Sequence, residues 1–163
     1  MRHSRLLILP ALAAAIVAPV SLAASSQPSV VVVSHGPVKL VYTDLGASGP
    51  SVGDVYSAYV PARGPGGKPA RVLGTLTTVA ENTPARGREI RTAKLVFLFS
   101  RPADQIEIGG ASVYSSVAQT RPRRSTTIRP IVGGSGAYAG ASGWAETIHF
   151  ANGRWEHRLH LDR

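Results

Sequence analysis

The chain has 163 residues, of which 44% are hydrophobic and 17% charged, and its formal net charge is +9. This length fits one domain, and the lack of cysteine excludes disulfides, iron–sulfur clusters and thiolate zinc sites. The 17 glycines and 12 prolines are scattered, which excludes collagen and a long helical bundle and favours many short strands joined by turns.

The first 23 residues have the pattern of a secretory signal peptide. Arg2 and Arg5 give a basic start, residues 6–22 form an apolar run, and Ala23 ends a small-residue cleavage motif. We therefore expect cleavage after Ala23 and a secreted protein, extracellular or periplasmic, with no stable membrane insertion afterwards. The alternative is a retained membrane anchor, but the run is short for a span and contains two prolines.

From Val30 onward, alternating or β-branched segments separated by Gly, Pro, Asn and Ser clusters predict strands rather than helices. The expected strands are 30–34, 38–44, 54–61, 70–80, 90–100, 105–108, 112–119, 126–132, 143–150 and 155–162. This many strands in one short domain predict a closed barrel or a sandwich.

The last hairpin carries the clearest pattern. Asn152-Gly153 favours a two-residue type I′ turn, because both central residues of that turn need a positive φ. The register that follows places Trp144, Glu146, Trp155 and His157 on one inward, mostly apolar face.

Glu146 and His157 interrupt that apolar face as diagonal neighbours, and they are our tentative catalytic residues. One interpretation is an acid/base or orienting pair in a ligand cavity, where burial would perturb both pKa values. The other is a structural pair at the barrel mouth. Other inward-facing side chains are predicted to bind the ligand: Tyr42, Asp44, Phe97, Phe99, Trp144 and Trp155.

The segment 93–99 is apolar on both faces. Phe97 and Phe99 share one face, whereas Val96 and Leu98 lie on the other. A strand of this kind needs cover on both sides, so we predict a homo-oligomer, a dimer or a trimer.

The densest basic run is Arg121-Pro122-Arg123-Arg124. No aromatic residues interleave with these arginines, so no nucleic-acid partner is predicted. A solvated cationic loop is the simpler interpretation, and contact with an anionic cell-wall polymer is the alternative.

No metal site is expected, because the predicted register puts His157 on the face opposite His149 and His160. No cofactor is expected either. The glycines at 133–136 lack the Lys-Ser/Thr and the following helix of a phosphate-binding loop.

Residues 131–143 read Ile-Val-Gly-Gly-Ser-Gly-Ala-Tyr-Ala-Gly-Ala-Ser-Gly. They resemble a motif of the allene oxide cyclase and dirigent barrel family, which has a hydrophobic pair, Gly-Gly-Thr-Gly, an aromatic residue and Ala-x-Gly. Gly53-Asp54 before a strand and residues 104–106 before Gly109-Gly110 fit the same family. The resemblance implies an all-β fold over 38–163, a single closed antiparallel eight-stranded barrel of calycin-like type, preceded by an N-terminal extension at 24–37.

The resemblance also implies a function: a barrel that binds a small apolar molecule in its lumen and steers its cyclisation or coupling without a cofactor. The chain departs from the family at Ser135, where Thr is usual, and at Ala139 and Ser142, where arginine is common. The family's catalytic glutamate and asparagine have no clear match in residues 39–44, so no catalytic residue is carried over. Three hypotheses stay open: a cofactor-independent cyclase or isomerase, a non-catalytic small-molecule-binding barrel, and a filled barrel with a surface or structural role.

Overall fold

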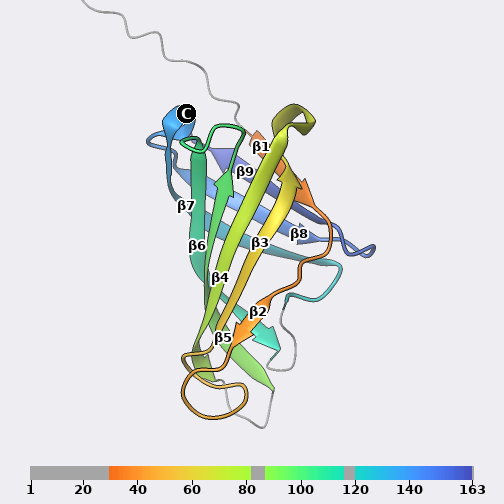
Figure 1. Ribbon diagram of the computed structural model, residues 1–163, viewed down its shortest axis with the longest axis vertical. Coiled ribbons are helices and arrows are strands. Elements are labelled where there is room, and N and C mark those ends of the chain that lie inside the picture. Colours follow the sequence, from red (N-terminus) through yellow and green to blue (C-terminus); the bar gives the residue numbers. More distant parts are fainter. Residues whose placement is uncertain (1–29, 82–86, 116–119, 163) are drawn as a thin grey trace, which may run out of the picture.

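The structure is a computed structural model that describes residues 30–81, 87–115 and 120–162, and it is all-β (Figure 1). The predicted signal peptide at 1–23 lies outside the described residues. The strands are β1 (Val30–His35), β2 (Val41–Thr43), β3 (Val55–Arg63), β4 (Pro69–Glu81), β5 (Arg88–Leu98), β6 (Gln105–Ser115), β7 (Ser125–Ser135), β8 (Gly143–His149) and β9 (Trp155–Leu161). The described helical segments are two single 3₁₀ turns, η1 (Pro65–Gly67) and η3 (Gly136–Tyr138).

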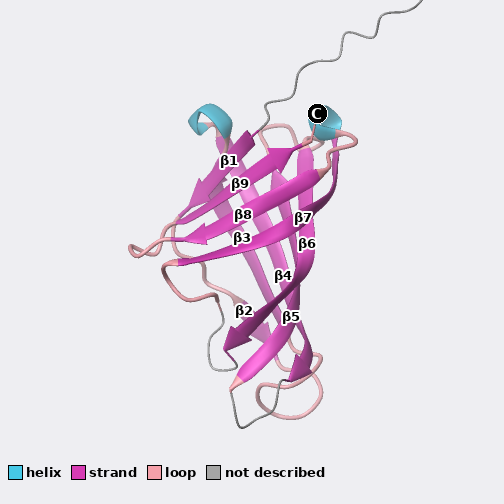
Figure 2. Cartoon of the chain, turned by 180° about the vertical axis from the view of Figure 1, so that it is seen from behind, coloured by secondary structure: helices cyan, strands magenta, loops and turns pink. Residues whose placement is uncertain are grey.

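The strands form one antiparallel sheet in the order β1-β9-β8-β7-β6-β5-β4-β3-β2. β1 also pairs with β3 through Ser34 and Arg63, and β2 pairs with the other end of β3 at residues 55–57. β1 and β2 pair with opposite ends of the same edge of β3, so together they occupy one strand position. The sheet therefore closes into the predicted eight-stranded barrel. In Figures 1 and 2, β7, β8, β9 and β1 cross the steeper strands β3–β6 and form the opposite wall.

Two groups of inward side chains form the hydrophobic core of the barrel. The smaller group is Tyr56, Leu76, Ala93 and Tyr114. The larger group centres on Phe97 and Leu159, both fully buried, and is Val31, Val33, Ala70, Val72, Phe97, Phe99, Ile106, Ile108, Ile131, Ala145, Leu159 and Leu161. The predicted inward orientation of Phe97 and Phe99 is therefore confirmed.

The Gly-rich motif closes one end of the barrel, where glycine is required by close backbone approaches. A Cβ on Gly134 would clash with the carbonyl oxygen of Tyr138 and lie 2.8 Å from that of Gln105. Gly136 has a φ of 60° and starts η3. Tyr138 in η3 then packs on Phe99, with ring centroids 4.7 Å apart. The motif serves the fold, because it lets the chain turn tightly over the core.

The predicted register of the last hairpin is wrong by one residue. His149 faces Trp155, and the connection has three residues, 151–153. Phe150 N–H donates to Arg154 O at 2.9 Å, and Gly153 N–H donates to Phe150 O at 3.0 Å. Gly153 therefore takes the left-handed position (φ 84°) of a turn with a bulge, not the second position of a two-residue turn.

The one-residue shift in register exchanges the inward and outward faces of β8 relative to the prediction, because side chains alternate along a strand. Ala145, Thr147 and His149 face the lumen, whereas Trp144 and Glu146 lie on the outer face. The strand β9 keeps the predicted orientation, with Trp155 and other alternate residues inward.

One predicted strand is confirmed and one boundary differs. The segment predicted as a strand at 30–34 is β1, which pairs along its length with β9. Gly109-Gly110 does not end a strand, since β6 continues along β5 to Ser115. The pairing with β7 does stop at Ile108, and there the glycines leave room for Pro130 and for the side chain of Arg129.

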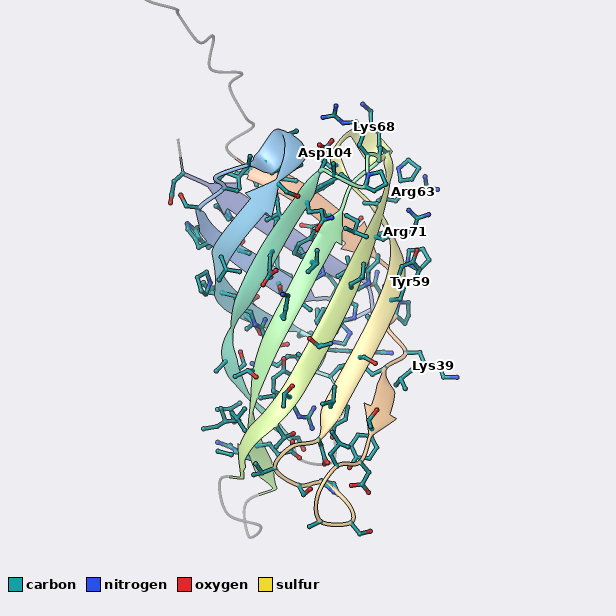
Figure 3. All side chains as sticks on the ribbon, turned by 60° about the vertical axis from the view of Figure 1, so that its left-hand side comes forward. Lys39, Tyr59, Arg63, Lys68, Arg71 and Asp104 are labelled. Atoms are coloured by element: carbon teal, nitrogen blue, oxygen red, sulfur yellow. The ribbon has the colours of Figure 1, made fainter. Side chains whose placement is uncertain are left out.

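The outer face of β3 and β4 is cationic (Figure 3). Tyr59, Arg63 and Arg71 are exposed on these strands, and Lys68 lies in the turn between them. None of these three basic side chains forms an ion pair with a described residue. Within the described part of the chain, no helix has the length and hydrophobicity to cross a membrane.

Candidate functional site

An apolar pocket opens in the barrel lumen and is the candidate site. Its volume is about 80 Å³, and its walls come from β1, β3–β7, β8 and β9 and from the connections at 36–40 and 120–124. This volume is below the roughly 300 Å³ of a pocket that encloses a drug-sized ligand. The lining residues are His35, Val38, Leu40, Ala58, Val60, Val72, Gly74, Leu76, Leu95, Tyr114, Thr120, Arg121, Arg129, Thr147, Trp155 and His157.

Two histidines form a hydrogen-bonded chain in the pocket wall. His35 Nε2 lies 3.1 Å from His157 Nε2, and His157 Nδ1 lies 3.0 Å from Thr147 Oγ1. His35 Nδ1 lies 2.7 Å from Gly36 O, which can only accept, so His35 carries its proton on Nδ1. His157 then donates from Nε2 to His35 and accepts at Nδ1 from Thr147. The contacts thus assign one tautomer to each neutral ring.

Burial keeps both rings neutral. Burial, together with electrostatic repulsion from His35 and Arg129, lowers the pKa of His157 to about 3. Burial also lowers the pKa of His35, although the hydrogen bond to Gly36 O opposes the shift. Rings with such pKa values donate and accept hydrogen bonds near neutral pH but hold no charge there.

Trp155 holds the histidines in place by stacking. Its ring stacks on His149 at a centroid distance of 3.9 Å and lies 6.2 Å from His35 on a nearly parallel plane. His149 Nδ1 donates to Arg121 O at 2.9 Å, which ties the 120–124 connection to the same stack. One edge of the pocket is therefore built from aromatic rings rather than flexible chains.

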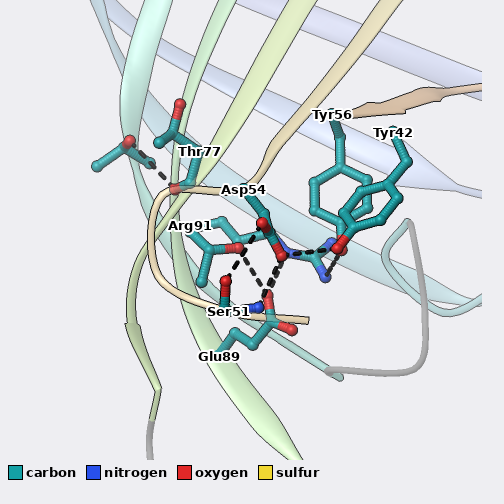
Figure 4. Close-up of polar contacts among 9 residues, drawn as sticks. Tyr42, Ser51, Asp54, Tyr56, Thr77, Glu89 and Arg91 are labelled. Carbon is teal, nitrogen blue, oxygen red and sulfur yellow. Dashed lines mark hydrogen bonds and ion pairs between the residues drawn. The ribbon is translucent and has the colours of Figure 1, made fainter. Parts of the chain in front are cut away.

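A buried ion pair lies on the lumen side of β5. Arg91 Nε donates to Glu89 Oε2 at 2.8 Å, and Arg91 Nη2 donates to Tyr56 OH at 3.1 Å (Figure 4). Thr78 Oγ1 donates to the same Glu89 oxygen at 2.8 Å. Both charged side chains are almost fully buried, so the charge of Arg91 is compensated inside the barrel.

A second buried arginine lies across the lumen on β7. Arg129 is 3% exposed, and its Nη2 donates to Tyr114 OH at 3.0 Å and to Ser112 Oγ at 3.2 Å. Its Nε is buried and has no hydrogen-bond partner. Arg121 from the 120–124 connection lies over the ring of Tyr114 at 5.8 Å, and its Nε also lacks a hydrogen-bond partner among the described residues.

Tyr42 and Asp54 organise the loop at the lower end of the barrel (Figure 4). Tyr42 OH donates to Asp54 Oδ2 at 2.8 Å, and the amides of Leu45 and Ser51 donate to the same carboxylate. Burial alone would raise the pKa of Asp54, but these hydrogen bonds lower it overall. Burial and the contact with Asp54 raise the pKa of Tyr42. Tyr42 therefore has a structural partner and does not line the pocket.

The structure brings two of the predicted site residues to the pocket, His157 and Trp155. Glu146 is not beside His157: it lies on the outer face, 3.7 Å from Arg158 and 3.8 Å from His160. Trp144 stacks on His160 outside the barrel at 3.8 Å.

The remaining predicted ligand-binding residues lie away from the pocket. Asp44 is exposed in a loop, where it accepts from Gly49 N. Phe97 packs edge-on against His157 at 4.9 Å, behind the pocket wall, and Phe99 packs at the far end.

The sequence analysis missed His35, Thr147 and Arg129. His35 could have been found, since it continues the inward alternation of Val31 and Val33. Thr147 was assigned to the outer face because the predicted hairpin register was wrong by one residue. The pattern around Arg129 pointed the other way, because β7 turns Ile128 and Val132 outward and Arg129 inward.

In the described part of the chain, no three His, Asp or Glu side chains come together as a group that could hold a metal ion.

No protein-family model matches the chain, and no curated protein does. Among solved structures, the chain is similar to a pyocyanin demethylase, with a TM-score of 0.62 and 17% identity over 81% of this chain and 99% of the other. It is also similar to a nonspecific heme-binding cyclase that catalyses a cycloaddition in neoabyssomicin biosynthesis. That match has a TM-score of 0.56 and 16% identity over 84% of this chain and 66% of the other. These similarities establish the small-barrel fold.

Proposed function

We propose that this protein binds a small, largely apolar organic molecule in the lumen of its barrel. The observation that carries the proposal is the pocket itself, which is lined by apolar side chains of three neighbouring strands, among them Val60, Val72, Leu76 and Leu95. Gly74 lies among them, and a Cβ there would come within 2.8 Å of Leu95 Cδ2. An open apolar lumen with a few polar groups is the usual form of a small-molecule site.

The neighbouring barrels support the same class of function. One is named a demethylase and the other a cyclase, so barrels of this shape act on small organic molecules. The Gly-rich motif at 131–143 adds a resemblance to the allene oxide cyclase and dirigent family, which we propose as the wider group of this protein.

A steering role in cyclisation or coupling is a second candidate, and the chain Thr147–His157–His35 favours it. All four ring nitrogens of the two histidines already have protein partners, so the chain fixes the pocket wall and leaves the hydroxyl oxygen of Thr147 as an acceptor for a bound molecule. Orientation alone can lower a reaction barrier, on the order of 7–11 kcal/mol in model systems. Glu146 has no part in this candidate, because it lies outside the barrel.

The binding proposal is tested by filling the lumen. Ala58→Phe places a ring in the pocket, and the matched control Ala111→Phe places the same ring on an exposed position of β6. We expect a titration with cinnamamide, followed by amide chemical shifts, to perturb Leu76, Leu95 and His157 in the native protein. Affinity should fall at least tenfold in Ala58→Phe and stay unchanged in Ala111→Phe. Absence of shifts, or shifts confined to the outer face, would refute lumen binding.

We also propose that the protein is exported and self-associates. The signal pattern at 1–23 supports export, and mass spectrometry of the secreted protein should give a chain starting at Ala24. Ile128, Val132 and Trp144 are exposed on neighbouring strands and support a homo-oligomer. Light scattering after gel filtration should give a dimer or trimer mass, and a monomer mass at high concentration would contradict it.

A further inference from the structure

The guanidinium of Arg129 is a buried charge without a counter-ion among the residues that the structure describes. Arg129 is 3% exposed, yet it forms no ion pair with any described residue. Its two hydrogen-bond partners, Tyr114 OH and Ser112 Oγ, are neutral hydroxyls, and its Nε has no partner. A buried charge is costly unless it is paired, so an arrangement of this kind calls for a missing anion.

The other buried arginine shows the contrast. Arg91 lies in the same lumen and has its carboxylate, Glu89, at 2.8 Å. Arg91 and Thr78 both donate to Glu89 Oε2, and Glu89 forms no ion pair with Arg129 among the described residues. The interior of the barrel therefore carries an excess positive charge on the side of β7.

That excess charge faces the pocket. Arg129 and Arg121 both line it and both contact Tyr114, and both have a buried Nε without a hydrogen-bond partner among the described residues. No Asp or Glu is among the lining residues. The electrostatic effect of Arg129 also reaches His157, two strands away on β9, where it helps to lower the pKa of the ring. An anionic group in the pocket would meet two guanidinium groups and no repelling carboxylate.

We infer that the ligand is a monoanion: a small molecule whose apolar part lies against Leu76 and Leu95 and whose single carboxylate, or a similar oxyanion, pairs with Arg129. The inference rests on the proposed lumen binding and adds its chemical class. Arg129 provides the anchor on β7, and Arg121 adds a second positive charge from the 120–124 connection. A guanidinium suits this task because its fixed planar donors match the two oxygens of a carboxylate.

The test compares two probes of equal shape, cinnamate and the neutral cinnamamide, by chemical-shift titration at pH 7. We expect cinnamate to bind the native protein at least tenfold more tightly. In Arg129→Gln the affinity for cinnamamide should stay within about twofold, and the preference for cinnamate should disappear. Arg129→Lys keeps the charge but loses the planar fork, so part of the preference should remain. This variant also covers the case in which Arg129→Gln fails to fold.

Equal affinity for the two probes in the native protein would overturn the inference while leaving lumen binding intact. A preference that persists in Arg129→Gln would overturn it as well. If neither probe binds, the proposed function itself fails, and the two failures are thereby distinguished. Arg71→Gln, on the exposed face of β4, is the control variant and should keep the full preference.

Discussion

Acidification should destabilise this barrel, because His157 must stay neutral in the folded state. Its pKa is about 3 when folded and near 6.5 when unfolded. Below pH 6.5 the unfolded chain therefore binds a proton that the folded chain rejects, so the free energy of unfolding falls as the pH falls from about 6.5 towards 3. One pKa unit corresponds to about 1.4 kcal/mol, which gives a loss of about 2 kcal/mol from His157 between pH 7 and pH 5.

The assay is urea unfolding at pH 7 and pH 5 of the native protein and of His157→Gln. Glutamine can still bond to Thr147 and His35 but does not titrate, so the loss between the two pH values should shrink by about 2 kcal/mol. The groups that face His157 are His35 on β1, Arg129 on β7 and Thr147 on β8. His35 contributes in the same direction and stays in the variant, so some pH dependence should remain.

His160→Gln is the matched control, since His160 lies on the outer face against Trp144. This variant should keep the pH dependence of the native protein. An equal loss of stability in the native protein and in His157→Gln would refute the reasoning, because the buried ring would then not be the group that titrates.

Three further predictions concern single positions. Gly134→Ala should lower the free energy of unfolding by at least about 2 kcal/mol in urea, because the new Cβ meets two backbone carbonyls, whereas Gly133→Ala, which meets nothing within 4 Å, should not. Tyr42→Phe removes a hydrogen-bond donor from the Asp54 carboxylate and should lower the free energy of unfolding by about 1–2 kcal/mol. Tyr59→Phe, at an exposed position, is the control and should leave the stability unchanged. Equal effects of the two substitutions would contradict the role of the contact. Glu146→Gln should change the stability by less than about 0.5 kcal/mol and leave the cinnamate affinity unchanged, and a loss of binding would contradict its placement outside the barrel.

The strands and the barrel could be predicted because their signals are local. Alternation and β-branching mark the strands, and Gly and Pro clusters mark the turns. The glycines at 133–136 also had a clear physical reason, which the close approach at Gly134 bears out.

The candidate site could be predicted only in part, because orientation depends on single residues. Asn152-Gly153 is compatible with a two-residue turn and with a turn plus bulge, and these differ by one residue. That difference moved Glu146 and Trp144 out of the lumen and Thr147 into it.

The strand β7 shows a second limit of pattern analysis. Its alternation of Ile128, Pro130 and Val132 indicates an inward apolar face, yet these residues are exposed and Arg129 is inside. Tyr114 and Ser112 supply the hydrogen bonds that make the inward arginine possible, and they lie on β6, outside any local window. These hydrogen bonds between β6 and β7 can be recognised only once the two strands have been placed next to each other.

The most direct measurement for the lumen as a ligand site is a crystal structure of the protein grown with saturating cinnamate. We predict electron density for the ring between Leu76 and Leu95, with a carboxylate oxygen about 3 Å from the guanidinium of Arg129. An empty lumen at saturation, or cinnamate bound only on the outer surface, would contradict the account.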